Sequence, residues 1–397
     1  MLRKVAVVGA GMTKFGRFES KGLMDMLTEA SLKAMDSAKI GDRDINAVYV
    51  STMMAGELTK QTATGTSLSD QLGIFPTAAC RVENGPASGG SAVLNGCLAV
   101  ASGVFDVVLV AGGEKMRHVP GERITDLIST MTHPVAEYPH GVTLPALAGL
   151  FTRLYMHKYG IKHKHLAMIA VKNQLNALMN PYAHIQTKIT LEAIEPELTP
   201  EAEMNNPIIA DPIRMYDCCP VTDGAAAVIL CAADIAKEFT DTPVQFKGIG
   251  QANDTLAVHE REDPTVLYAV KGAAKMAFDM AKLSPSDINV VELHDAFEIL
   301  EIAESEDSGF FAKGTSHKAV EEGVTQIGGK LPINPSGGLK ARGHPVGATG
   351  VAQVCELLWQ LQGEAGGRQV KGAERAYCCN FGGFGNNVTA FVFERMR

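Results

Sequence analysis

The stretch Asn334–Gly350 places one histidine, His344, at the end of a glycine-dense loop. Pro345 follows at once, and small and then apolar residues continue over Val346–Leu361. Glycine permits a tight turn, proline is favoured in the first turn of a helix, and the backbone N–H groups of that turn are free to face a ligand. The pattern therefore predicts a ligand-facing histidine at a helix start. A structural glycine loop with a capping histidine is the alternative.

The elements that must position this histidine alternate between strands and helices. A buried strand opens the chain and runs into a glycine turn, but Lys14 stands where a dinucleotide-binding G-x-G-x-x-G motif has its third glycine. The alternation predicts an α/β layered fold with largely parallel strands. The expected segments are a strand in 5–16, a helix at about 22–38, a strand at 47–51, a helix at 66–72, a helix at 86–102 and a strand at 106–114.

An internal repeat divides the chain. Residues 34–48 align without gaps with residues 277–291, and eight of the fifteen positions are identical. We therefore predict two similar halves, 1–115 plus 215–243 and 244–397. Residues 116–214 lie outside the repeat and are expected to form an inserted loop domain for substrate and subunit contacts.

Composition narrows the class of protein. The 397 residues are 46% hydrophobic and 20% charged, with a net charge of −8 and no sustained basic stripe, which argues against a nucleic-acid partner. No apolar run reaches the length of a membrane span, and eight scattered cysteines without a Cys-x-x-Cys pair favour a reduced, cytoplasmic protein with no metal site. One basic group is a candidate for an anionic ligand or a solvated helix face: Arg153, Lys158, Lys162 and Lys164.

Five motifs together resemble the thiolase superfamily, in particular its archaeal and sterol-carrier-protein types. They are Val8–Gly16, Cys219–Ala227, His294–Phe297, Asn334–Gly350 and Asn380–Gly383. The resemblance spans essentially the whole chain. It implies a five-layered αβαβα fold and chemistry at the Cα–Cβ bond of CoA thioesters, with coenzyme A as part of the substrate and no bound cofactor. It also implies a homodimer or a dimer of dimers, and a small zinc-ribbon/OB-fold partner protein.

The resemblance assigns roles to individual residues. His344 matches the histidine that activates the nucleophile and holds the thioester oxygen, and His294 matches the residue that completes this oxyanion site. Such preorganised donors stabilise the enolate of a thioester. Asn380 stands at a further catalytic position. The remaining assignments are Gly382 and Gly383 for the backbone of the oxyanion site, and Ser336, Gly337 and Gly343 for substrate binding.

The catalytic thiols of the resembled family are absent. Pro86 stands at the nucleophile position, and it lacks both a thiol and a backbone N–H. Ala296 and Asn380 stand at the two positions of the acid/base cysteine, with Cys379 one residue early and predicted to face the other way on a strand. Neither Ser88 nor Cys80 is well placed to substitute.

The retained residues serve enolate chemistry and the lost ones serve acyl capture. The leading hypothesis is therefore retro-aldol cleavage of a β-hydroxyacyl-CoA, with His344 or His294 as the general base. A β-ketoacyl-CoA thiolase with an unconventional mechanism is the first alternative. A non-catalytic, thiolase-like subunit of a complex is the second.

Overall fold

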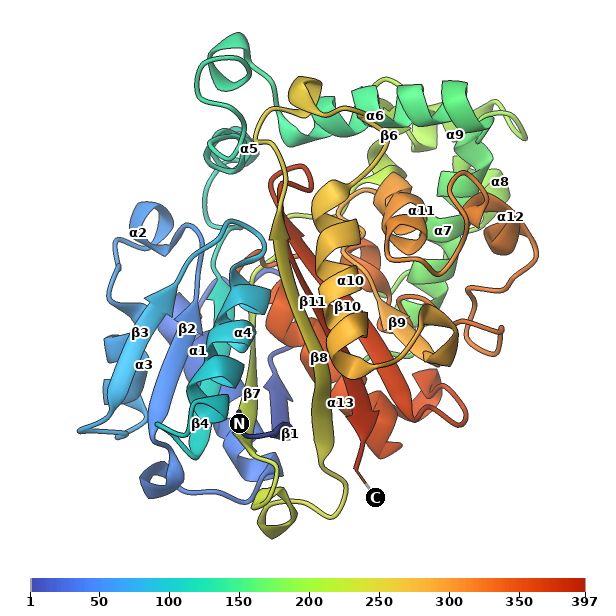
Figure 1. Ribbon diagram of the computed structural model, residues 1–397. Coiled ribbons are helices and arrows are strands. Elements are labelled where there is room, and N and C mark those ends of the chain that lie inside the picture. Colours follow the sequence, from blue (N-terminus) through green and yellow to red (C-terminus); the bar gives the residue numbers. More distant parts are fainter. Residues whose placement is uncertain (1, 397) are drawn as a thin grey trace.

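The protein is built on one mixed nine-stranded sheet with helices on both faces (Figure 1). The computed structural model describes residues 2–396. Its strands are β1 (Val5–Met12), β2 (Ala47–Ser51), β3 (Ala78–Val82), β4 (Val107–Glu114), β5 (Ile208–Ala210), β6 (Ile213–Arg214), β7 (Gly224–Ala232), β8 (Val244–Asn253), β9 (Val290–Glu292), β10 (Arg375–Gly382) and β11 (Asn387–Arg395). Its helices are α1 (Leu23–Ser37), α2 (Ala55–Leu58), α3 (Thr64–Gln71), α4 (Ser88–Ala101), α5 (Gly121–Ser129), α6 (Leu144–Tyr159), α7 (His163–Ala177), α8 (Leu191–Ile194), α9 (Glu201–Asn205), α10 (Tyr268–Ala281), α11 (Glu298–Asp307), α12 (Ser316–Glu321) and α13 (Thr349–Gln362).

The order of the strands is mirrored about the pair formed by β1 and β8. The sheet runs β3-β2-β4-β7-β1-β8-β11-β10-β9, so β2, β4, β7 and β1 of the first half mirror β9, β10, β11 and β8 of the second. In the first half β2 and β4 pair in parallel, and β4–β7 and β7–β1 are antiparallel; in the second half β9 and β10 pair in parallel, and β10–β11 and β11–β8 are antiparallel. The halves join where β1 and β8 pair antiparallel at Ala6–Gln245 and Val7–Val244.

The prediction of largely parallel pairing was wrong. Among the strands that the structure describes, the parallel pairs are β2–β3, β2–β4 and β9–β10, and the remaining pairs are antiparallel. A hairpin joins β10 directly to β11, and the chain returns from the inserted segment to place β7 antiparallel to β4. Antiparallel neighbours need no helical crossover.

The helices complete the predicted five-layered αβαβα arrangement. α1 packs on the outer face of the first half and α10 on the outer face of the second, while α4 and α13 lie against each other between the two halves. Small residues make this central contact possible. A Cβ added to Gly89 in α4 would lie 2.7 Å from the backbone nitrogen of Gly350 in α13.

The residues shared by the repeat hold equivalent positions in the two halves. Added Cβ atoms on Gly9 and Gly248 would lie 2.5 and 1.9 Å from the carbonyl oxygens of Ala34 and Ala277, a pair of identical positions. In the same way, the side-chain oxygens of Asn46 and Asn289 each accept two backbone N–H groups at the start of the neighbouring strand. The repeat therefore reflects close strand–helix packing and strand entry.

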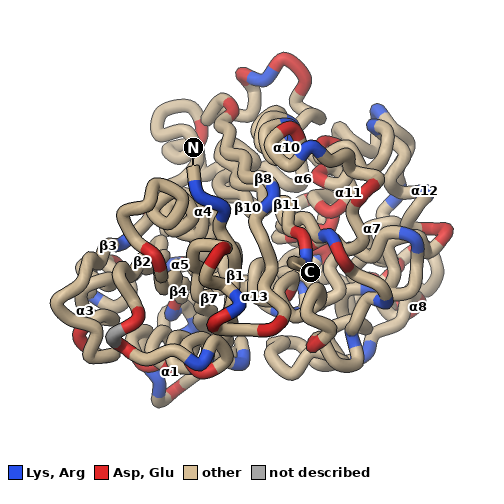
Figure 2. Tube along the Cα trace, turned by 60° about the horizontal axis from the view of Figure 1, so that its bottom comes forward, with Lys and Arg blue, Asp and Glu red and all other residues tan. Residues whose placement is uncertain are grey.

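The segment between the halves forms α5 to α9 and covers one end of the sheet (Figure 1). Acidic and basic residues are interspersed along the trace, including around α7, α8 and α12 (Figure 2). Three members of the predicted basic group form ion pairs with carboxylates: Arg153–Asp211, Lys158–Asp263 and Lys164–Glu321. Within residues 2–396, no helix has the length and apolar character needed to cross a membrane.

Candidate active site

The loop that carries His344 is held by a carboxylate from the neighbouring motif. Gly337 and Gly338 adopt φ values of +97° and +59°, and a π-helical segment follows over Gly338–Arg342. Asp295 accepts the N–H of Leu339 at 2.7 Å. A Cβ on Gly338 would lie 2.1 Å from an Asp295 oxygen, so this position requires glycine. The contact ties the His344 loop to the residue next to His294.

Asn380 fixes the tautomer of His294. The Asn380 side-chain oxygen accepts the N–H of Gly90 at 2.9 Å, which orients the amide. Its NH₂ group therefore points toward His294 and donates to Nδ1 at 2.9 Å, with Pro86 O 3.3 Å away. Because Nδ1 accepts, the proton of neutral His294 lies on Nε2. His294 is thus a hydrogen-bond donor through Nε2.

His344 is held in the opposite tautomer to His294. Its Nδ1 lies 2.7 Å from the hydroxyl of Thr349, and that hydroxyl donates to the carbonyl of Pro345 at 3.2 Å. Nδ1 of His344 then carries the proton and donates to Thr349, which leaves the lone pair on Nε2. The two imidazole rings meet edge to face, with centroids 4.9 Å apart.

Both histidines are kept neutral by their surroundings. Burial, with a further contribution from the Arg342 guanidinium, lowers the pKa of His344 to about 3. Burial, followed by the proximity of His344 and Arg342, lowers the pKa of His294 well below its usual value. Desolvation disfavours the charged imidazolium in each case.

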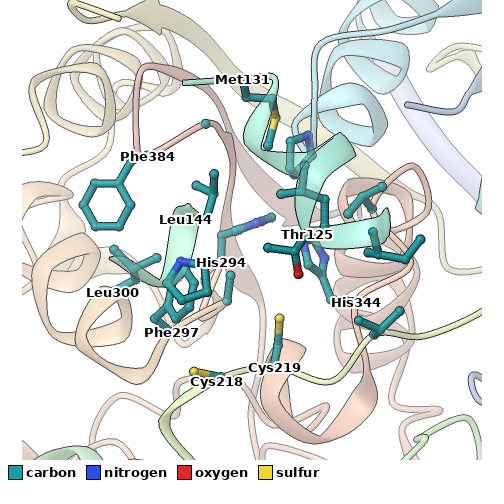
Figure 3. Close-up of a pocket in the computed structure, with 18 of the residues that line it drawn as sticks. Thr125, Met131, Leu144, Cys218, Cys219, His294, Phe297, Leu300, His344 and Phe384 are labelled. Atoms are coloured by element: carbon teal, nitrogen blue, oxygen red, sulfur yellow. The ribbon is translucent and has the colours of Figure 1, made fainter. Parts of the chain in front are cut away.

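The two rings line a cavity of about 160 Å³. Pro86 at the start of α4 and Ala296 also line it, together with apolar side chains from α5, α11 and the start of α6 (Figure 3). The Cys219 sulfur points into the cavity, whereas the Cys218 sulfur is turned aside (Figure 3) and donates to the carbonyl of Arg214 at 3.4 Å. The site therefore combines two neutral imidazoles, one thiol and an apolar wall.

Comparison with known proteins identifies the family. The model of the thiolase N-terminal domain matches residues 5–234, and that of the thiolase C-terminal domain-like region matches residues 250–395. The chain belongs to the thiolase family. Thiolases of this family are enzymes that act on CoA thioesters, and acyltransferases and aldolases both occur among the proteins similar to this chain.

Relatives of known name align with nearly the whole length of this chain. Acetyl-CoA acetyltransferase of Methanothermobacter thermautotrophicus is 46% identical over 394 residues, which cover 99% of this chain and 100% of the relative. Human sterol carrier protein 2 is 33% identical over 416 residues, covering 99% of this chain and 72% of the relative. Among solved structures, the Ltp2–ChsH2(DUF35) aldolase has a TM-score of 0.83 at 23% identity, covering 99% of this chain and 98% of that one, and so shares its fold.

The structure brings some of the predicted site residues together and separates others. His344, His294, Pro86, Ala296 and Gly383 line one cavity. Asn380 does not line the cavity but lies behind His294 and contacts that ring, so it affects a bound substrate only through His294. Gly382 lies outside the lining as well, at the end of β10.

The residues predicted to bind substrate lie elsewhere. Ser336 is fully buried and donates to Glu292 at 2.8 Å, in a network that includes the Arg342–Glu292 ion pair at 3.1 Å. Gly337 packs on Ala177, and Gly343 adopts a φ of +108°. These three residues shape the loop beneath His344, and none of them is among the residues that line the cavity.

None of the three residues weighed as substitutes for the missing thiols is among those that line the cavity. The Ser88 hydroxyl donates to the Gly85 carbonyl at 2.5 Å, Cys80 is exposed on β3, and Cys379 is buried in the core under α10 and α11. Sequence reasoning overlooked Cys219. The available signal was its place in one of the five motifs. In the fold the segment of Cys219 runs beside Ala296, whose carbonyl accepts the Cys219 N–H at 3.0 Å.

A buried carboxyl cluster was also not foreseen. Oxygens of Asp295, Glu298 and Glu301 lie within 4.8 Å of one another. The Asn173 amide donates to Asp295 at 2.9 Å and Lys172 pairs with Glu301. Burial raises the pKa of Asp295 to about 6 and that of Glu298 well above its usual value. Lys172 thus offsets part of the negative charge of this cluster, and the Asn173 amide satisfies a carboxylate oxygen of it.

Proposed function

We propose that this thiolase-family enzyme cleaves, or in reverse forms, the Cα–Cβ bond of a β-hydroxyacyl-CoA by aldol chemistry. The observation that carries the proposal is Pro86 in the cavity beside two intact imidazoles. Proline offers no nucleophile for an acyl intermediate and no N–H for a second oxyanion site. Aldol cleavage needs neither. In this scheme CoA enters as part of the substrate.

His294 would stabilise the enolate. Its Nε2–H is set by Asn380 at 2.9 Å before any substrate enters, and the ring is 1% exposed. A preorganised donor in a site without water contributes more to catalysis than the same donor in solution. The thioester oxygen would accept this hydrogen bond as negative charge develops.

His344 would take the proton of the β-hydroxyl through Nε2. The Cα–Cβ bond then breaks, its electron pair forms the enolate, and the β-carbon leaves as an aldehyde or ketone. Protonation of His344, whose pKa burial lowers to about 3, is favoured only while the enolate lies beside it. His344 therefore acts in step with the charge that His294 stabilises.

Cys219 would return a proton to Cα. Burial raises the pKa of this thiol to about 12, so it is protonated before the reaction. After the thiol protonates the enolate carbon, the thiolate regains its proton from His344. The net result is one proton moved from oxygen to carbon, with no acyl adduct and no consumption of free CoA.

Acyl transfer is the second candidate. It is favoured by the 46% identity over the whole chain to a protein named acetyl-CoA acetyltransferase. Such a reaction would need a nucleophile other than residue 86, and Cys219 is the thiol whose sulfur points into the cavity.

Product analysis separates these reactions. The protein is incubated with β-hydroxyacyl-CoA or β-ketoacyl-CoA, with and without free CoA, and examined by intact-mass spectrometry. We expect an aldehyde or ketone plus acyl-CoA from the β-hydroxy substrate, without an adduct. CoA-dependent cleavage of the β-keto substrate, or an acyl adduct, would support the acyltransferase instead. No turnover of either would favour a non-catalytic subunit.

A second measurement tests whether the Cys219 thiol delivers the proton to Cα. Every acyl-CoA product takes one hydrogen at Cα, so in D₂O the informative quantities are the rate of its formation and the side of Cα that receives the deuterium. Cys219→Ala should slow product formation and lose the stereospecific placement of deuterium, while the neighbouring Cys218→Ala serves as the matched control. An unchanged rate and stereochemistry in Cys219→Ala would remove Cys219 from the mechanism.

We also propose a cytoplasmic homodimer or dimer of dimers that binds a small zinc-ribbon/OB-fold protein. The name of the Ltp2–ChsH2(DUF35) aldolase, which pairs two proteins, supports the partner protein, and eight free cysteines support the cytoplasmic location. Co-purification with such a partner, followed by mass measurement of the complex, tests the assembly.

A further inference from the structure

The polar side chains that line the cavity are His294, His344, Thr125 and the two cysteines Cys218 and Cys219, and Figure 3 shows Thr125 and Cys219 close to His344. Met131 lies on the side of the cavity away from Cys219 (Figure 3), and no charged side chain is among the residues that line it. The apolar wall includes Ile124, Ile128, Met131, Leu144, Leu300 and Phe384. A charged or hydrogen-bonding substituent would find no partner among these side chains.

The inserted segment supplies much of this wall. Ile124 and Ile128 come from α5, Met131 follows that helix, and Leu144 begins α6. Met131 also lies against the turn that presents Pro86, because a Cβ added to Gly85 would lie 2.5 Å from its sulfur. A side chain at position 131 therefore limits how far the cavity extends away from Cys219.

The volume limits the group that fits. The cavity measures about 160 Å³. An apolar protein cavity of about 150 Å³ accommodates benzene. A two-carbon acetyl group would leave most of this apolar space unfilled, whereas each methylene that enters it should raise affinity about fourfold.

We propose that the acyl group bound here is uncharged, apolar and of about six carbons in size. The inference rests on the proposed function in one respect: the reacting carbonyl of a CoA thioester lies at the end with the two histidines. The apolar remainder of the acyl group then fills the space between α5, Met131 and Leu144.

Binding of saturated acyl-CoAs tests the proposal without requiring turnover. Affinities of the full-length protein are measured by calorimetry for acetyl-, butyryl-, hexanoyl-, octanoyl- and decanoyl-CoA. We expect affinity to rise by about fourfold per methylene up to hexanoyl-CoA and then to level off or fall. Equal affinity for acetyl- and hexanoyl-CoA, a continued rise to decanoyl-CoA, or no binding of any of them would overturn the inference.

A variant locates the effect. Met131→Trp should shorten the acyl chain at which affinity stops rising to butyryl or less, because the larger ring fills the cavity. Met276→Trp changes the same residue type on the exposed face of α10 and should leave the series unchanged. An unchanged series in Met131→Trp would show that the acyl group binds elsewhere. If hexanoyl-CoA binds as expected but β-hydroxyhexanoyl-CoA is not cleaved, the proposed reaction fails and this inference stands.

Discussion

Replacing Asn380 with aspartate perturbs the tautomer of His294 with almost no change in shape. The oxygen that accepts the Gly90 N–H at 2.9 Å is retained. The NH₂ group, however, becomes a second oxygen 2.9 Å from Nδ1 of His294 and 3.3 Å from Pro86 O. An oxygen there favours a proton on Nδ1 of His294. Nε2 then loses its proton, and the enolate loses one donor.

Loss of one oxyanion donor costs about 10²- to 10³-fold in kcat, or about 3–4 kcal/mol. We expect Asn380→Asp to lower the rate of Cα proton exchange of an acyl-CoA in D₂O by this factor, with KM little changed, because the donor acts mainly on the charged enolate. Proton exchange needs only the enolate, so the assay does not depend on aldol or acyl-transfer chemistry.

Asn206→Asp is the matched control. Asn206 is fully buried outside the cavity, and its amide also accepts one backbone N–H and donates to one carbonyl, each at 2.8 Å. Nitrogen NMR of the ring of His294 should show Nε2 protonated in the wild type and Nδ1 protonated in Asn380→Asp. Full exchange activity in Asn380→Asp, or Nδ1 protonated in the wild type, would refute this account of the site.

Three further changes test other parts of the site. Pro86→Cys restores a thiol and an N–H at the start of α4, and intact-mass analysis should then detect an acyl adduct that the wild type lacks; absence of the adduct would show that residue 86 does not face the thioester. Gly90→Ala places a Cβ 2.0 Å from a threonine oxygen of β11 and should lower the free energy of unfolding by about 1–3 kcal/mol. In Gly367→Ala, its control, the nearest atom is 3.5 Å away, and equal stability of the two variants would contradict the packing. His344 in the folded state has a pKa of about 3, so the unfolded chain binds a proton first as pH falls below about 6.5 and stability declines. Between pH 6.5 and 5, urea denaturation should show a loss about 1.6 kcal/mol smaller in His344→Gln than in the wild type, with exposed His259→Gln as the control; an identical loss in His344→Gln would mean that His344 is not kept neutral.

Much of the fold could be predicted because it depends on local and repeated patterns. The identities of the repeat correspond to contacts made twice, such as the strand glycines against Ala34 and Ala277 and the N–H groups held by Asn46 and Asn289. Strand direction was the exception. A buried apolar strand has the same side-chain pattern whether its neighbour is parallel or antiparallel, so the sequence cannot decide it.

The sequence by itself determined which side chains are missing. Pro86, Ala296 and Asn380 lack the thiols of the resembled family, and no fold can supply a thiol to those residues. It also identified the two histidines from their motifs.

Only the tertiary structure decided what the remaining residues do. Asn380 sets the proton of His294 because α4 brings the N–H of Gly90 to its amide from 290 positions away in the chain. Cys219 lines the cavity because its segment runs beside Ala296. Ser336 lies outside the cavity because Glu292 and Arg342 hold it beneath the loop. Tautomers, burial and the size of the acyl cavity arise from contacts between distant segments, and residue types and spacing alone do not contain them.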